Sequence, residues 1–182
     1  MSTERGPSLQ LLDGGRPVAV TFEQMLDFHA GNSPGGVAHA YKVLERGLPL
    51  IAPGGPPERR EIAVRTAFGG PGARDGFEFA TLASGEGRYV VDPALARPER
   101  GRALERFVFE LRHGDAAATL VLREGYVSDE FIDLARDEGR SEAGERRLTS
   151  LKAEMAELVM SRPAAEVYDA ERPEDVRSEG QP

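Results

Sequence analysis

The first strongly patterned stretch of this 182-residue chain predicts two helices joined by a polar turn. In the first helix, three apolar residues and a histidine share one face at helical spacing: Phe22, Met25, Leu26 and His29. Thr21 with Gln24 has the form of a capping box, which predicts that the helix begins there. Pro34 suits the first position of a second helix, whose apolar stripe is Val37, Ala40, Tyr41 and Leu44. The turn at residues 31–33 then presents free backbone N–H groups, which suit an anion or a polar ligand.

The pattern after residue 45 predicts both strands and helices. Alternation of apolar and polar residues predicts strands at 62–67, 89–91, 106–112 and 116–123, the last two joined as a hairpin. Apolar residues at steps of three and four predict helices at 73–84, 128–137 and 142–161. The Pro/Gly-rich segment 47–57 is predicted to be a connecting loop. The fold class expected is therefore α+β, a mixed β-sheet flanked by helices, with two N-terminal helices and a C-terminal helical extension.

Length and composition predict one domain with short appendages. We expect residues 1–19 to form an N-terminal arm, residues 20–169 to form the domain, and the charged residues 170–182 to form a mobile tail. The net charge of −8 argues against nucleic acid as a partner, because phosphate binding needs a basic surface. No apolar run approaches the roughly 20 residues that cross a membrane, so we expect a cytoplasmic protein without membrane contact.

The chain contains no cysteine. Disulfides, thiolate catalysis and every cysteine-bearing zinc or iron–sulfur site are therefore excluded. A metal of the zinc type would need three or four ligands, which only histidine and carboxylate side chains remain to supply. His29 is the candidate ligand for such a site, and a divalent metal is the candidate cofactor.

The eight residues 28–35 read F-H-A-G-N-S-P-G. They resemble the F-H-G-H-x-C-P-G motif that opens the FmdE-like family, which is named for a component of formylmethanofuran dehydrogenase. His29, Pro34 and Gly35 keep the motif, whereas Gly31 replaces its second histidine and Ser33 its cysteine. The segment D-G-F-E-F-A-T at residues 75–81 and the order of the later elements extend the resemblance over roughly residues 20–170.

This resemblance implies a compact α+β domain of the FwdE/GAPDH-domain-like type, found as a homodimer. It also implies that the metal-binding cysteines of the family cannot operate in this chain, which would be a divergent, cysteine-less member.

These observations predict a pocket at the helix–turn–helix corner, which we define as residues 22–44. Its expected ligand is a small polar or anionic molecule, or a metal, and its predicted ligand-binding residues are Asn32, Ser33, Gly35, His39 and Lys42. The predicted catalytic residues are His29, Asp75 and Glu78, since the two carboxylates lie three residues apart on one helical face. His39 and Lys42 are expected on the solvent side of the second helix.

Each of these residues also has a structural explanation. His29 is as well explained as a buried histidine bonded to the backbone. Ser33, four residues after it, has the spacing of a nucleophile and base pair but is better explained as a helix N-cap. Asp75 and Glu78 suit the start of a helix.

Two other functions stay open. One is a small metabolic enzyme in which His29 acts as general acid/base and Asp75 or Glu78 orients it. The other is a structural accessory subunit, in which the apolar stripe between residues 148 and 158 docks a partner helix.

Overall fold

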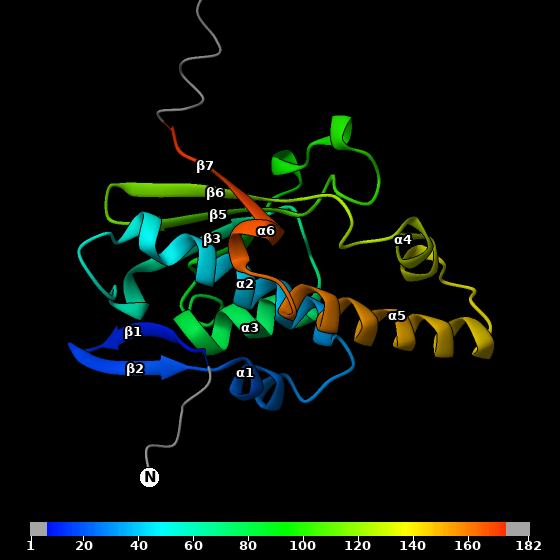
Figure 1. Ribbon diagram of the computed structural model, residues 1–182, viewed down its shortest axis with the longest axis horizontal. Helices are drawn as coiled ribbons and strands as arrows, with labels where there is room; N and C mark the ends of the chain where they lie inside the picture. The colour runs from blue at the N-terminus through cyan, green and yellow to red at the C-terminus, as the bar shows by residue number, and fades with distance from the viewer. Residues whose placement is uncertain (1–6, 174–182) are drawn as a thin grey trace, which may run out of the picture.

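An 18-residue helix, α2 (Pro34–Ile51), lies between a five-stranded sheet and the helix α3 (Pro71–Thr81) (Figure 1). The structure is a computed structural model, and it describes residues 7–173. Twelve of the α2 residues are buried, on every side of the helix. A helix that is covered all round is a core element rather than a surface element. The other elements are therefore arranged around α2.

The main sheet has the strand order β4-β3-β5-β6-β7. Its strands are β3 (Ile62–Thr66), β4 (Tyr89–Val91), β5 (Val108–His113), β6 (Ala116–Leu122) and β7 (Tyr168–Glu171). Strands β3 and β4 are parallel and joined through α3, whereas the other neighbours are antiparallel. The sheet is thus mixed, and the α+β class predicted from the sequence is confirmed.

One face of this sheet carries the core and the other is polar. Along β3, Ile62, Val64 and Thr66 are buried and alternate with half-buried Ala63 and Arg65. The register continues the inner face across the strands, with Val64 opposite Leu111 and Leu111 opposite Ala118. Helix α2 covers this inner face (Figure 1). A solvated outer face is common for sheets with antiparallel strands, and it explains the alternation seen in the sequence.

The remaining helices are α1 (Phe22–His29), α4 (Asp129–Arg136), α5 (Glu142–Met160) and α6 (Ala164–Val167), with short 3₁₀ helices at Arg59–Glu61, Pro93–Leu95 and Pro98–Arg100. The capping box predicted for α1 is present, because Thr21 Oγ1 accepts from the N–H of Gln24 and Gln24 Oε1 accepts from the N–H of Thr21. Helices α4 and α5 begin and end within a residue of their predicted limits.

Of the segment predicted as an N-terminal arm, residues 1–19, the first six residues lie outside the described part of the chain, and most of the rest forms a hairpin of β1 (Leu9–Asp13) and β2 (Arg16–Val20). Leu9, Leu11 and Val20 join the main core, so the hairpin belongs to the domain. Gly14 and Gly15 make its turn with positive φ angles, and their N–H groups donate to the Glu58 carboxylate at 2.7 and 3.0 Å. The Asp-Gly-Gly run in the sequence is a turn signal that could have predicted this hairpin.

Two predicted boundaries were also wrong. Helix α2 continues through Pro49 to Ile51, because buried Leu48 and Ile51 hold its last turn while Pro49 is exposed. Strand β7 uses residues 170 and 171, which were assigned to the tail. The end of the predicted tail, residues 174–182, lies outside the described residues.

Glycines allow α2 and α3 to approach each other closely. A Cβ at Gly36 would lie 2.8 Å from the N atom of Ala73, and one at Gly76 would lie 2.8 Å from the Cβ of Ala40. A Cβ at Gly72 would overlap the carbonyl oxygen of Ser33. Backbone atoms cannot move aside as a side chain can, so these positions require glycine. The contact brings the N-termini of α2 and α3 side by side.

We predict that Gly72→Ala destabilises the protein by about 2–3 kcal/mol, because overpacking against backbone outweighs the roughly 1 kcal/mol gained in helix propensity. Urea unfolding measures the change. Gly54→Ala is the matched control, since nothing lies within 4 Å of a Cβ there. Equal stability of the two variants would contradict the close approach of the helices.

Candidate functional site

His29 connects three helices at the predicted corner. It is the last residue of α1, and its Nδ1 lies 2.8 Å from Oδ2 of Asp75 on α3. Its Nε2 accepts the backbone N–H of Ser33, the N-cap residue of α2, at 3.2 Å. Because Nε2 is an acceptor, we assign the ring proton to Nδ1, which donates it to Asp75. His29 therefore fixes the ends of α1, α2 and α3 relative to one another.

This geometry leaves His29 little freedom for chemistry. Both ring nitrogens have partners and only 7% of the side chain is exposed. Ser33 engages the ring through its backbone N–H, which does not activate its hydroxyl as a nucleophile. Among residues 7–173, no three His, Asp or Glu side chains gather as a metal site would require. The residues present therefore do not fit a metal at His29.

The two predicted carboxylates have different hydrogen-bond partners. Asp75 pairs with His29, as the enzyme hypothesis required of one of them. Glu78 accepts the N–H of Gly85 at 2.9 Å and so supports the loop after α3. The structure thus brings Asp75 to His29 but not Glu78.

His39 and Lys42 were wrongly placed on the solvent side of the second helix. His39 is completely buried, with Nδ1 2.7 Å from the hydroxyl of Tyr168, and burial lowers the pKa of its imidazole to about 3. Lys42 is buried as well and pairs with Glu45 at 2.9 Å. Both face inward because α2 is covered on all sides. The spacing of apolar residues identifies one buried face of a helix and cannot show that the opposite face is buried too.

A pocket of about 520 Å³ opens at the N-termini of α2 and α3. The turn and first residues of α2 supply Asn32, Ser33, Gly35 and Gly36. The loop between β3 and α3 supplies Phe68, Gly69 and Gly70, and the first turn of α3 supplies Pro71 and Gly72. The opposite side comes from the segment 102–107 and from α4, α5 and the turn between them. The α2–α3 contact described above therefore forms one wall of the pocket.

Five cationic side chains line this pocket: Arg102, Arg106, Arg136, Arg140 and Lys152. No Asp or Glu of the described residues lines it. Carboxylates that pair with three of the arginines lie outside the lining: Asp133 with Arg102, Glu105 with Arg136 and Glu145 with Arg140. Burial, followed by the charge of Arg140, lowers the pKa of Lys152, and the charge of Glu145 opposes this shift.

The two helices that begin at the pocket are not capped by side chains. Helices α1, α4 and α5 begin with hydroxyl caps from Thr21, Ser128 and Ser141. Helices α2 and α3 instead begin at Ser33 and Gly70 without a side-chain cap, and each has proline at its first position. The positive ends of both helix dipoles and their free N–H groups therefore face the pocket.

The predicted ligand-binding residues divide into two groups. Asn32, Ser33 and Gly35 line the pocket, as expected from the turn before α2. His39 and Lys42 do not, and neither do the three predicted catalytic residues. The basic residues were missed because they come from segments more than 60 residues away in the sequence. The helix predicted at 73–84 begins at Pro71 instead, within the Gly-Gly-Pro-Gly run after β3, which has the form of a loop that starts a helix.

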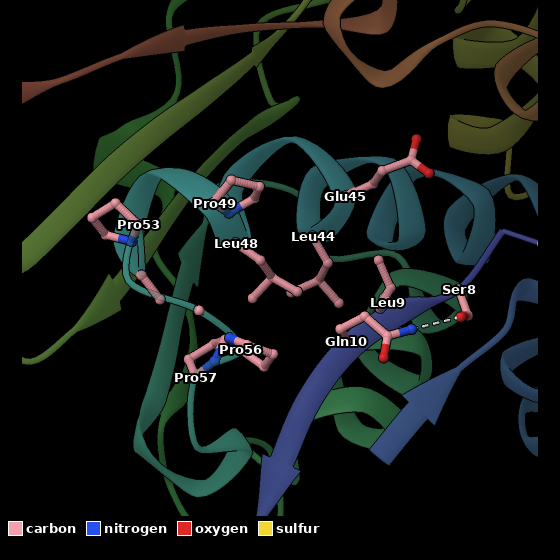
Figure 2. Close-up of a pocket in the computed structure, with 12 residues that line it drawn as sticks. Ser8, Leu9, Gln10, Leu44, Glu45, Leu48, Pro49, Pro53, Pro56 and Pro57 are labelled. Atoms are coloured by element: carbon pink, nitrogen blue, oxygen red, sulfur yellow. Dashed lines mark hydrogen bonds between the residues drawn. The ribbon is translucent and has the colours of Figure 1, made fainter. Parts of the chain in front are cut away.

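A second pocket, of about 370 Å³, lies between the hairpin and the end of α2 (Figure 2). Leucines and prolines dominate its lining, including Leu44, Leu48 and Pro57. Its polar groups include Glu45 and the Gln10 amide, which donates to Ser8 Oγ at 2.8 Å. It offers no convergent set of charged groups, so the basic pocket is the better candidate for a functional site.

Comparison with known proteins identifies no relative: no family model matches this chain, and no curated protein matches it. The resemblance to the FmdE-like family therefore stays a prediction. Within residues 7–173, no helix has both the length and the apolar character needed to cross a membrane.

We expect the His29–Asp75 pair to contribute to stability as a unit. In a double-mutant cycle of His29→Ala and Asp75→Ala, followed by urea unfolding, the coupling free energy should be about 1–2 kcal/mol. The exposed pair Arg147–Glu130 serves as control and should show a smaller coupling. Additive effects at His29 and Asp75 would refute the three-helix connection.

Stability should fall in acid because of His39. The folded-state pKa of about 3 is below the ordinary 6.5, so the unfolded chain takes up the proton first and stability is lost as the pH falls below 6.5. This costs about 1.4 kcal/mol at pH 5.5. His39→Asn should abolish this part of the pH dependence in urea unfolding, and His113→Asn is the matched control. A dependence that survives His39→Asn would contradict the assignment.

Proposed function

We propose that this protein binds a small anion in the basic pocket at the N-termini of α2 and α3. The observation that carries the proposal is the set of five cationic side chains around a cavity that no described carboxylate lines. Since the chain as a whole has a net charge of −8, this local excess of positive charge runs against its composition. A cavity of this charge recognises carboxylates and phosphates.

Two of the cations are available to a ligand. Within the described part of the chain, Arg106 and Lys152 form no ion pair, whereas the other three basic residues are held by carboxylates. A bound anion would offset the burial and the repulsion that lower the pKa of Lys152. The bound anion would thereby favour the charged ammonium form of Lys152.

Backbone donors complement these side chains. The first turns of α2 and α3 present N–H groups from Gly35, Gly36 and Gly72 at the pocket. Oxyanions bind at such helix N-termini because the N–H groups lack partners within the helix and the dipole is positive there. The volume of about 520 Å³ lies within the range of small-molecule sites.

This proposal keeps the ligand class expected from the sequence and changes most of the residues that bind it. His29 and Asp75 position the helix ends instead of acting on a substrate. The resemblance to the FmdE-like family supports a ligand-binding role at this corner, and it further suggests a homodimer in the cytoplasm. The enzyme hypothesis has less support, because Nε2 of His29 is already bonded.

Amide NMR titration with inorganic phosphate tests the proposal. Phosphate should shift the amide signals of Gly35, Gly36 and Gly72, and Arg106→Gln should weaken binding about 5- to 20-fold, as expected for loss of one charge-assisted contact. Lys152→Gln should act in the same direction. Binding should also weaken as salt is raised.

Arg146→Gln is the matched control, since Arg146 lies on α5 but does not line the pocket. It removes the same charge and should leave the affinity for phosphate unchanged. Equal losses in Arg106→Gln and Arg146→Gln would show non-specific attraction, and unshifted glycine amides would rule out binding at the helix N-termini.

A further inference from the structure

The basic pocket also has an apolar part. Six of its lining residues have apolar side chains: Phe68, Phe107, Phe131, Ile132, Ala135 and Met155. Phe107, Phe131, Ile132 and Met155 are at most 9% exposed, so they form the fixed surface of the cavity. A site for a free inorganic ion would not need such a surface, because a hydrated anion gains nothing from apolar side chains.

Phe68 is the aromatic residue of the lining that is only partly buried. Its ring is stacked on that of buried Phe107, with 4.4 Å between centroids and 24° between planes. Gly70 gives the ring room, because a Cβ there would lie 2.5 Å from two of its carbons. The stack holds Phe68 in place at the cavity, next to the N-terminus of α3.

Phe68 comes from a different element than the cations. The loop before α3 supplies Phe68, whereas the cations come from the segment 102–106, from α4 and α5 and from the turn between them. Phe68 lies beside the first turn of α3, so a ligand bound at that helix N-terminus can meet the cations and the aromatic ring together. An aromatic ring on the ligand can pack against Phe68 in an offset or edge-to-face arrangement.

On the basis of the proposed function, we propose that the ligand is an aromatic organic anion, with a phosphate or carboxylate group at the helix N-termini and its ring against Phe68. The anionic group gives the charge contacts described above. The ring replaces water over the exposed part of Phe68, and this apolar contact distinguishes the ligand from inorganic phosphate.

Isothermal titration of the unmodified protein with methyl, cyclohexyl and phenyl phosphate tests this inference. Phenyl phosphate should bind at least about tenfold more tightly than methyl phosphate, and more tightly than cyclohexyl phosphate, which has the volume but not the flat ring. Equal affinity for methyl and phenyl phosphate would overturn the inference and leave the proposed function intact. Equal affinity for cyclohexyl and phenyl phosphate would overturn the inference that the ring of the ligand is aromatic. If none of the three binds, the proposed function itself fails.

A variant provides a second readout. Phe68→Leu should weaken phenyl phosphate about fivefold and leave methyl phosphate unchanged, since only the ring contact is removed. Phe28→Leu is the control, because Phe28 is 50% exposed and lies outside the pocket lining. Equal weakening of both ligands by Phe68→Leu would show that Phe68 merely supports the pocket. The ligand series on the unmodified protein decides the question if this variant is unstable.

Discussion

The close contact between α2 and α3 is the constraint on which the rest of the structure depends. Gly36, Gly72 and Gly76 lack the Cβ atoms that would separate the two helices, so backbone meets backbone at Gly36 and Gly72, and Gly76 meets the Cβ of Ala40. This contact places α2 over the sheet and α3 in the crossover between parallel strands β3 and β4. It also sets two helix N-termini next to each other, where their dipoles repel unless something negative lies between them. The fold therefore places two positive helix ends beside a cavity, which is the basis for proposing an anionic ligand.

His29 shows how a residue with catalytic potential can serve a structural purpose. Its two nitrogens bond to Asp75 on α3 and to the N–H of Ser33 at the start of α2. Loss of this side chain would free two helix ends, and the pocket wall is built from those ends. In the proposed function, the role of His29 is therefore indirect, through the positions of the backbone donors.

The pocket concentrates positive charge in an acidic protein. Its arginines belong to the turn segment 102–106 and to the C-terminal helical region, and the carboxylates of Glu105, Asp133 and Glu145 hold three of them from outside the lining. Such pairing fixes the side chains and lowers the entropy lost when a ligand binds. If carboxylates neutralised all five cations, the pocket would no longer attract an anion. Among the described residues, Arg106 and Lys152 form no ion pair, so their positive charges remain.

The local pattern of the chain was enough to predict most elements and the fold class, because helical and strand periodicity arise from local geometry. The capping box at Thr21, the α5 stripe and the β5–β6 hairpin were all predictable in this way, and so was the turn before α2, whereas an anion bound at that turn stays a prediction. Tertiary packing alone established that His39 is buried, that residues 9–20 pack on the core, and that basic residues from distant segments meet at residues 32–36. The physical reason is that the burial of a helix on a second side depends on long-range packing, and so does the convergence of distant segments. Long-range packing leaves no periodic pattern in the sequence.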